Sequence, residues 1–91
     1  MPIEQKVVLM ESDSNYTIIY LNNGQKILSG YNLKFFENIT DSQSFMRLNR
    51  SEIINKIFVK FINLNDSSLT LNNGRTVYIS RRRIKAFQAW I

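Results

Sequence analysis

The 91-residue sequence contains no cysteine, no histidine and only three glycines. It therefore offers no thiolate nucleophile, no imidazole base and no ordinary zinc site. Three glycines are too few for a glycine-rich phosphate loop, and the scattered carboxylates include no pair spaced for acid/base chemistry. A Ser–Lys dyad is the one catalytic arrangement left open. We expect a protein that is not an enzyme and that uses no metal, cofactor or small-molecule substrate.

Long hydrophobic runs are also missing. No stretch of about 18 apolar residues is present to span a membrane, and the first residues, MPIEQK, lack the apolar segment of a secretory signal. We therefore expect a cytoplasmic protein. The length suits a single domain over residues 1–91. Its one Trp, four Tyr and six Phe provide enough large side chains for a packed core.

The last acidic residue of the chain is Asp66, so the last quarter of the sequence contains none. Five basic residues follow it: Arg75, Arg81, Arg82, Arg83 and Lys85. Before that point seven basic residues balance seven acidic ones, so the whole net charge of +5 lies in residues 67–91. This asymmetry predicts a partner that carries negative charge.

Most of the chain has the pattern of β-strands. Runs rich in β-branched and aromatic residues, bounded by turn residues, occupy 6–10, 17–21, 25–29, 45–48, 56–62, 68–71 and 76–79. Asn-Asn-Gly occurs twice between such runs, at 22–24 and 72–74, and Asn-Gly accepts positive φ at both central turn positions. Each tripeptide therefore predicts a hairpin. The segments LNNGQKILSGYNLKFF and LNNGRTVYISRRRIKAF align with one inserted residue, as an internal repeat or as a chance recurrence.

Two or three short helices are expected between the strands. Residues 31–39 place Leu33 and Phe36 on one face. Asn49 followed by Glu52 fits a capping box and predicts a helical turn through Asn55. The predicted fold class is therefore mainly β, with antiparallel strands and two or three short helices.

The last helix is expected from about Arg81, with Ser80 as its N-cap. Its apolar stripe contains Ile84, Phe87 and Ile91, with Trp90 beside it. Three arginines at a helix start oppose local helix physics, because each cation there costs about 0.3–1 kcal/mol. Free N–H groups and guanidinium groups at such a start would both bind a phosphate. The alternative is a solvated basic face that only aids solubility.

Two other polar stretches are candidates for binding. Arg47 and Arg50 flank Asn49, and Ser51 follows. Arginine suits guanine edges and phosphates, and asparagine suits adenine, although the capping box explains Asn49 equally well. Asn15 with Tyr16 lies between the first two strands, where a plain hairpin loop is the alternative.

Together these stretches resemble the LytTR DNA-binding domain of bacterial transcriptional regulators. The resemblance runs from about residue 8 to residue 87. Its most specific part is F-x-R-x-N-R-S-x-I-x-N followed, after a hairpin, by L-x-N-G-x-x-x-x-I-S-R-R. It implies an elongated fold of several antiparallel sheets, used as an output domain of response regulators. The receiver domain often found upstream in the family is not encoded in these residues, so the chain is expected to be either a stand-alone regulator or a fragment of a longer one.

The family also implies that side chains from loops, and not an inserted helix, read double-stranded DNA in a sequence-specific manner. The DNA-binding residues expected here are Asn15, Tyr16, Arg47, Asn49, Arg50, Ser51, Ser80, Arg81, Arg82, Arg83 and Lys85. Arginines and asparagines would read base edges, whereas lysines, Ser51 and Ser80 would contact the backbone. Family analogy further implies a homodimer on repeated half-sites.

Two alternatives belong to other classes. The basic segment SRRRIKAFQAWI could bind an anionic membrane surface, unless Ile84, Phe87 and Trp90 pack against the sheet. Single-stranded RNA binding requires solvent-facing aromatic residues on the sheets. The residues to inspect for this are Tyr16, Tyr20 and Phe61.

Overall fold

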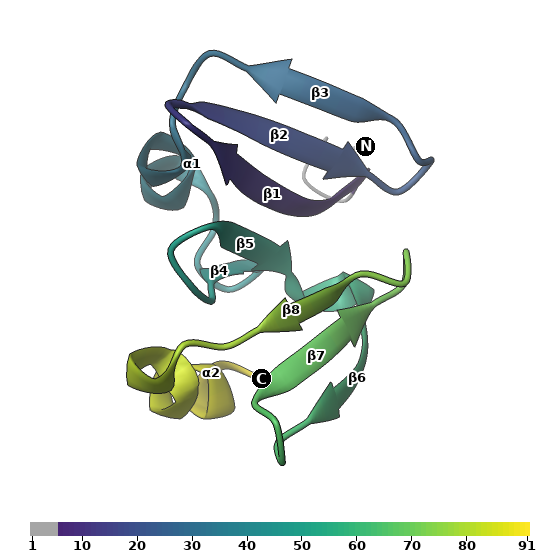
Figure 1. Cartoon of the computed structure of the whole chain (residues 1–91), viewed down its shortest axis with the longest axis vertical. Coiled ribbons are helices and arrows are strands. Elements are labelled where there is room, and N and C mark those ends of the chain that lie inside the picture. The colour runs from purple at the N-terminus through teal and green to yellow at the C-terminus, as the bar shows by residue number, and fades with distance from the viewer. Residues whose placement is uncertain (1–5) are drawn as a thin grey trace.

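The computed structural model describes residues 6–91, which form two antiparallel sheets and two short α-helices (Figure 1). The first sheet has the order β3-β2-β1-β5-β4 and contains β1 (Val7–Asp13), β2 (Tyr16–Leu21), β3 (Lys26–Ser29), β4 (Phe45–Arg47) and β5 (Glu52–Asn55). The second has the order β6-β7-β8 and contains β6 (Val59–Asn63), β7 (Ser68–Leu71) and β8 (Thr76–Tyr78). The helices are α1 (Leu33–Ile39) and α2 (Ile84–Trp90). The predicted fold class is confirmed.

The chain repeats one unit, a three-stranded meander followed by a helix: β1-β2-β3-α1 and β6-β7-β8-α2. The first turn of each unit contains a serine with positive φ, Ser14 at 56° and Ser67 at 55°. The first strand of each unit also has a register shift near its start, in β1 and again in β6. The likeness therefore extends to strands whose sequences did not align.

The two Asn-Asn-Gly hairpins form as expected, but their turns differ from the expected type. Positive φ occurs at Gly24 (89°) and Gly74 (88°), whereas both asparagines of each turn keep negative φ. The Gly74 N–H donates to the Leu71 carbonyl at 2.9 Å, and Leu71 N–H donates to the Arg75 carbonyl at 2.9 Å. This is a three-residue loop whose glycine takes the left-handed position.

The predicted helical turn over 49–55 is wrong, because Glu52–Asn55 is strand β5. It pairs with β1 on one side and β4 on the other. Ile53 and Ile54 are both fully buried, in two different hydrophobic clusters. Successive side chains point to opposite faces only in a strand, so burial of both isoleucines overrides the local capping pattern. The expected strand 56–62 likewise begins with a 3-10 turn, η2 (Lys56–Phe58), before β6.

The main hydrophobic core joins the two sheets and α2. Phe87 of α2 is fully buried in it, with Ile84 and Trp90 packed against it. Lys56 Nζ lies 4.6 Å from the centre of the Trp90 ring and donates to the Trp90 carbonyl oxygen at 2.6 Å. Ile84, Phe87 and Trp90 are therefore used by the fold, whereas Ile91 at the end of the stripe is 49% exposed. No helix within residues 6–91 is long and apolar enough to cross a membrane.

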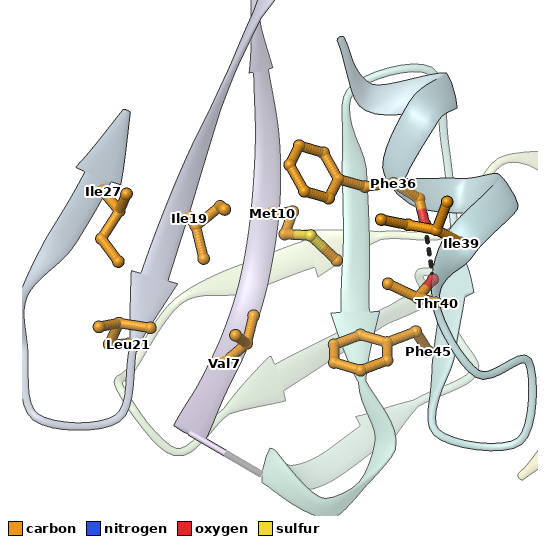
Figure 2. Close-up of a pocket in the computed structure, with 9 residues that line it drawn as sticks. All are labelled: Val7, Met10, Ile19, Leu21, Ile27, Phe36, Ile39, Thr40 and Phe45. Carbon is orange, nitrogen blue, oxygen red and sulfur yellow. Dashed lines mark hydrogen bonds between the residues drawn. The ribbon is translucent and has the colours of Figure 1, made fainter. Parts of the chain in front are cut away.

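A second cluster lies under α1, on the other face of the five-stranded sheet. Asn32 starts this helix by accepting a hydrogen bond from Phe35 N–H at 2.9 Å. The helix covers only part of the face and leaves an apolar hollow of about 240 Å³ (Figure 2). The hollow is lined by Val7, Met10, Ile19, Leu21, Ile27, Phe36, Ile39, Thr40 and Phe45.

Candidate nucleic-acid interface

The three polar stretches expected to bind DNA come together on one side of the molecule, along the left of Figure 1. The β1–β2 turn is joined to the β4–β5 loop, because Ser12 N–H donates to the Ser51 carbonyl at 2.8 Å. The β4–β5 loop is joined to the segment after β8, because Ser80 N–H donates to the Leu48 carbonyl at 2.9 Å. Residues from distant parts of the sequence thus form one continuous surface.

Asn49 holds the middle loop in place. Its Nδ2 donates to Glu52 Oε1 at 3.0 Å and to the Tyr78 carbonyl at 2.7 Å. Its Oδ1 accepts from Ser51 N–H at 2.8 Å. The capping residues Asn49 and Glu52 do interact as the sequence indicated, but they order a loop before a strand. Because both ends of the Asn49 amide are engaged, this side chain ties the loop to β8.

Arg47 and Arg83 are also engaged within the protein. Arg47 donates to the carbonyls of Asn49 (3.1 Å) and Arg50 (2.6 Å), and it pairs with Glu37 Oε1 at 3.0 Å. Arg83 Nη1 donates to the Arg47 carbonyl at 3.0 Å and lies 3.9 Å from Glu37 Oε2. These two arginines fix the loop that they flank.

Four basic residues of this surface are exposed, and their side chains make no hydrogen bond or ion pair within residues 6–91. They are Arg50, Arg81, Arg82 and Lys85. Asn15 and Ser51 are also exposed, and Tyr16 is 51% exposed at the start of β2. The side chains available to a partner are therefore a subset of the predicted ones.

Ser80 does not cap the last helix. Residues 81–83 form a 3-10 turn, η3, and α2 begins at Ile84 with no side-chain cap. The Ser80 hydroxyl is buried and has no hydrogen-bond partner in the described part of the chain. Its backbone fixes the segment instead, because its carbonyl accepts from Arg83 N–H at 2.9 Å.

Arg75 is one of the five basic residues expected to attract an anionic partner, but its side chain is paired within the protein. Its Nη2 pairs with Glu11 and, at 3.0 Å, with Glu52, and its guanidinium lies 5.2 Å from the ring of Tyr20. The Tyr20 hydroxyl donates to Glu11 Oε1 at 2.6 Å. Arg75 extends from the hairpin of the second sheet to the surface of the first, so its charge is neutralised there.

This charge cluster shifts the pKa values of its members. Burial raises the pKa of Glu11, but hydrogen bonds from Tyr20 and Arg75 and the charges of Arg75 and Lys26 outweigh it, so the pKa is lower than usual. The hydrogen bond to Glu11, assisted by burial, raises the pKa of Tyr20. Burial alone would lower the pKa of Arg75, yet its bonds to Tyr20 and Glu11 raise it. The arginine is charged at every ordinary pH.

Tyr78 is an exposed member of this surface that the sequence analysis did not include. Its side chain is 60% exposed, and its carbonyl accepts the bond from Asn49. The sequence signal that predicts its exposure is the alternation in β8, where Thr76 and Tyr78 lie on the face opposite to the buried Val77.

Free arginine and lysine side chains on loops can contact phosphates and base edges. The arrangement is therefore typical of domains that bind nucleic acid through loops. A family model described as the LytTr DNA-binding domain matches residues 3–91. The chain belongs to this family, as its motifs indicated, and is a DNA-binding domain of a regulator.

One solved structure is described as the LytTr DNA-binding domain of a methyl-accepting/DNA response regulator from Bacillus cereus. The chain is 27% identical to it, the match covers 96% of this chain and 82% of that one, and the TM-score is 0.85. No curated protein sequence matches the chain.

Proposed function

We propose that this domain binds double-stranded DNA in a sequence-specific manner through the three joined loops and so regulates transcription. The observation that carries the proposal is that the β1–β2 turn, the β4–β5 loop and the segment after β8 are joined by hydrogen bonds on one side of the fold. These segments and the start of α2 carry the exposed residues Asn15, Arg50, Arg81, Arg82 and Lys85. Arginine and asparagine distinguish base edges, and arginine and lysine also bind phosphates. Such a regulator would act in the bacterial cytoplasm, where the DNA is.

The hydrogen bonds separate the predicted residues into those that hold the loops and those that are free to contact DNA. Arg47, Asn49 and Arg83 have their donors directed to the protein, so we assign them to holding the loops. Arg82 with Asn15 would read base edges. The phosphate contacts would come from Arg50, Ser51, Arg81 and Lys85, with Tyr16 beside the reading loop.

The shape of the domain supports contact with a long stretch of duplex. Its Cα atoms extend 34 × 24 × 21 Å, and the three loops are distributed along the longest dimension (Figure 1). One turn of B-DNA is about 34 Å long. A single domain can therefore follow about one turn along one side of the duplex. Two copies would then occupy repeated half-sites, which is the homodimeric arrangement that we propose.

The two alternatives receive less support from the geometry. The apolar face of α2 packs into the core, so membrane binding would lack its hydrophobic component. Among the aromatic residues that single-stranded RNA would need, Tyr16 and Phe61 are exposed but lie on different sheets, and Tyr20 is engaged by Glu11. Tyr16, Tyr20 and Phe61 therefore do not form a row of exposed rings on which successive bases could stack.

Selection of bound duplexes from a random pool tests the proposal directly. The expected result is an enriched motif, ideally as two half-sites in a fixed spacing. Recovery of unrelated sequences with the same affinity would show that charge alone binds and that the loops read nothing. Parallel selection with single-stranded RNA and flotation with anionic liposomes would expose either alternative.

A further inference from the structure

A continuous chain of side-chain contacts crosses from the first sheet to the DNA-facing loop. It begins with the Tyr20 hydroxyl on Glu11 (2.6 Å) and continues through Arg75, which pairs with both Glu11 and Glu52. Glu52 then accepts from Asn49 Nδ2 at 3.0 Å. Every link joins residues of different strands or loops, so the chain connects the two sheets to the loop at 49–51.

We propose that Arg75 is a positioning residue for DNA recognition, which rests on the function proposed above. The two oxygens of Glu52 have different partners, Arg75 at Oε2 and Asn49 at Oε1, both at 3.0 Å. By holding the carboxylate, Arg75 fixes the orientation of the Asn49 amide. That amide in turn orders Ser51 N–H and the Tyr78 carbonyl, and so sets the loop beside Arg50 and the segment that leads to Arg81 and Arg82.

The surroundings of Arg75 favour this role over direct contact with DNA. Its side chain is 30% exposed, that of Glu52 is 14% exposed, and two carboxylates face one guanidinium. A phosphate would have to displace Glu11 or Glu52 from Arg75 and would be repelled by the carboxylate that stayed. The planar guanidinium also matches two carboxylates at once, which a lysine ammonium does less well.

Arg75→Met, with Arg81→Ala as the control that removes a phosphate contact, tests the assignment on the 91-residue chain. The readouts are affinity for the selected duplex and for random duplex, the salt dependence of each, and amide hydrogen exchange at Ser51. For Arg75→Met we expect about tenfold weaker binding to the selected duplex, as for one lost charged hydrogen bond. The salt slope should stay unchanged and Ser51 N–H should exchange faster. Arg81→Ala, which removes a proposed phosphate contact, should lower the slope by about one and leave Ser51 exchange as in wild type.

Arg75→Lys should restore part of the preference and part of the Ser51 protection, because one carboxylate can still be paired. A slope lowered by about one in Arg75→Met, with Ser51 exchange unchanged, would make Arg75 a phosphate contact and overturn the inference. Failure of the wild-type chain to prefer any duplex would refute the proposed function instead. Faster Ser51 exchange in Arg75→Met would then still support the chain of contacts.

If Arg75→Met does not fold, a matched pair at Glu52 replaces it. Glu52→Gln weakens the pairing with Arg75 but keeps an oxygen for Asn49, whereas Glu52→Ala removes both contacts. Ser51 exchange should rise in both variants, more in Glu52→Ala, and preference for the selected duplex should fall in the same order. Wild-type exchange and preference in both variants would show that the chain of contacts positions nothing.

Discussion

Nη1 of Arg83 donates a hydrogen bond to the backbone carbonyl of Arg47 at 3.0 Å, and Glu37 lies within 4 Å of both guanidinium groups. The last arginine of the triplet is therefore part of the scaffold, whereas Arg81 and Arg82 are exposed. Three residues that are identical in the sequence have two different roles.

Arg83→Ala should accordingly destabilise the protein. Loss of the bond to the Arg47 carbonyl should lower the free energy of unfolding by about 1–2 kcal/mol, as measured by urea denaturation. Arg81→Ala is the matched control and should stay within about 0.5 kcal/mol of wild type. Equal stability of the two variants would contradict the scaffold role.

Arg82→Ala should act on recognition and not on stability. We expect a loss of about 1–3 kcal/mol in binding to the selected duplex, with weaker discrimination at one base pair, as for a base-reading arginine. Arg81→Ala should weaken all duplexes alike. Competition binding on selected and random DNA separates the two, and identical behaviour of both variants would rule out the reading role of Arg82.

Binding should fall steeply with salt. The three cations proposed to contact phosphates, Arg50, Arg81 and Lys85, give a slope of log K against log salt of about −3. Titration of a labelled duplex at several salt concentrations measures it. A flat response would remove the electrostatic basis of the proposal.

Asn15→Ala should relax sequence preference. Asn15 is exposed at the β1–β2 turn and has no partner within residues 6–91, so its removal leaves the fold intact. Preference at one or two base pairs should weaken while binding to random duplex stays nearly constant. Equal losses on both duplexes would instead assign the turn to backbone contact.

Stability should depend on Glu11 at low pH. Its pKa in the folded protein is lower than in the unfolded chain, so its contribution is complete above the ordinary carboxyl value and is lost as the pH falls through the folded value. Glu11→Gln should therefore flatten the acid limb of unfolding free energy measured between pH 7 and pH 2. Tyr20 has a raised pKa, so its contribution should be lost as the pH rises through the folded value above 10.0. An acid limb unchanged in Glu11→Gln would exclude Glu11 as its source.

Local patterns predicted the hairpins and both helices, because each depends on residues close in sequence. They did not predict that the three candidate loops lie side by side, because that follows from the pairing of distant strands. The strand β5 was missed because Asn49 and Glu52 carry a helix-start pattern, and only the clusters on either side of Ile53 and Ile54 decide against it.

The role of Arg75 could not be predicted for a related reason. Its acidic partners lie 64 and 23 positions away in the chain. A count of charges along the sequence does not show which carboxylate a cation meets after folding, so the basic cluster of residues 67–91 was expected to be larger than it is.

The separation between held and free side chains has an evolutionary consequence. The residues that keep the loops in place donate their hydrogen bonds inward, whereas Asn15, Arg50, Arg81 and Arg82 contribute no such bond within residues 6–91. If the proposed roles hold, substitutions at Asn15 and Arg82 would change which base pairs are read, substitutions at Arg50 and Arg81 would change affinity, and all of them would leave the scaffold almost as stable as before. Under the proposed function, a lineage of such regulators would acquire new promoters by single substitutions without losing the fold.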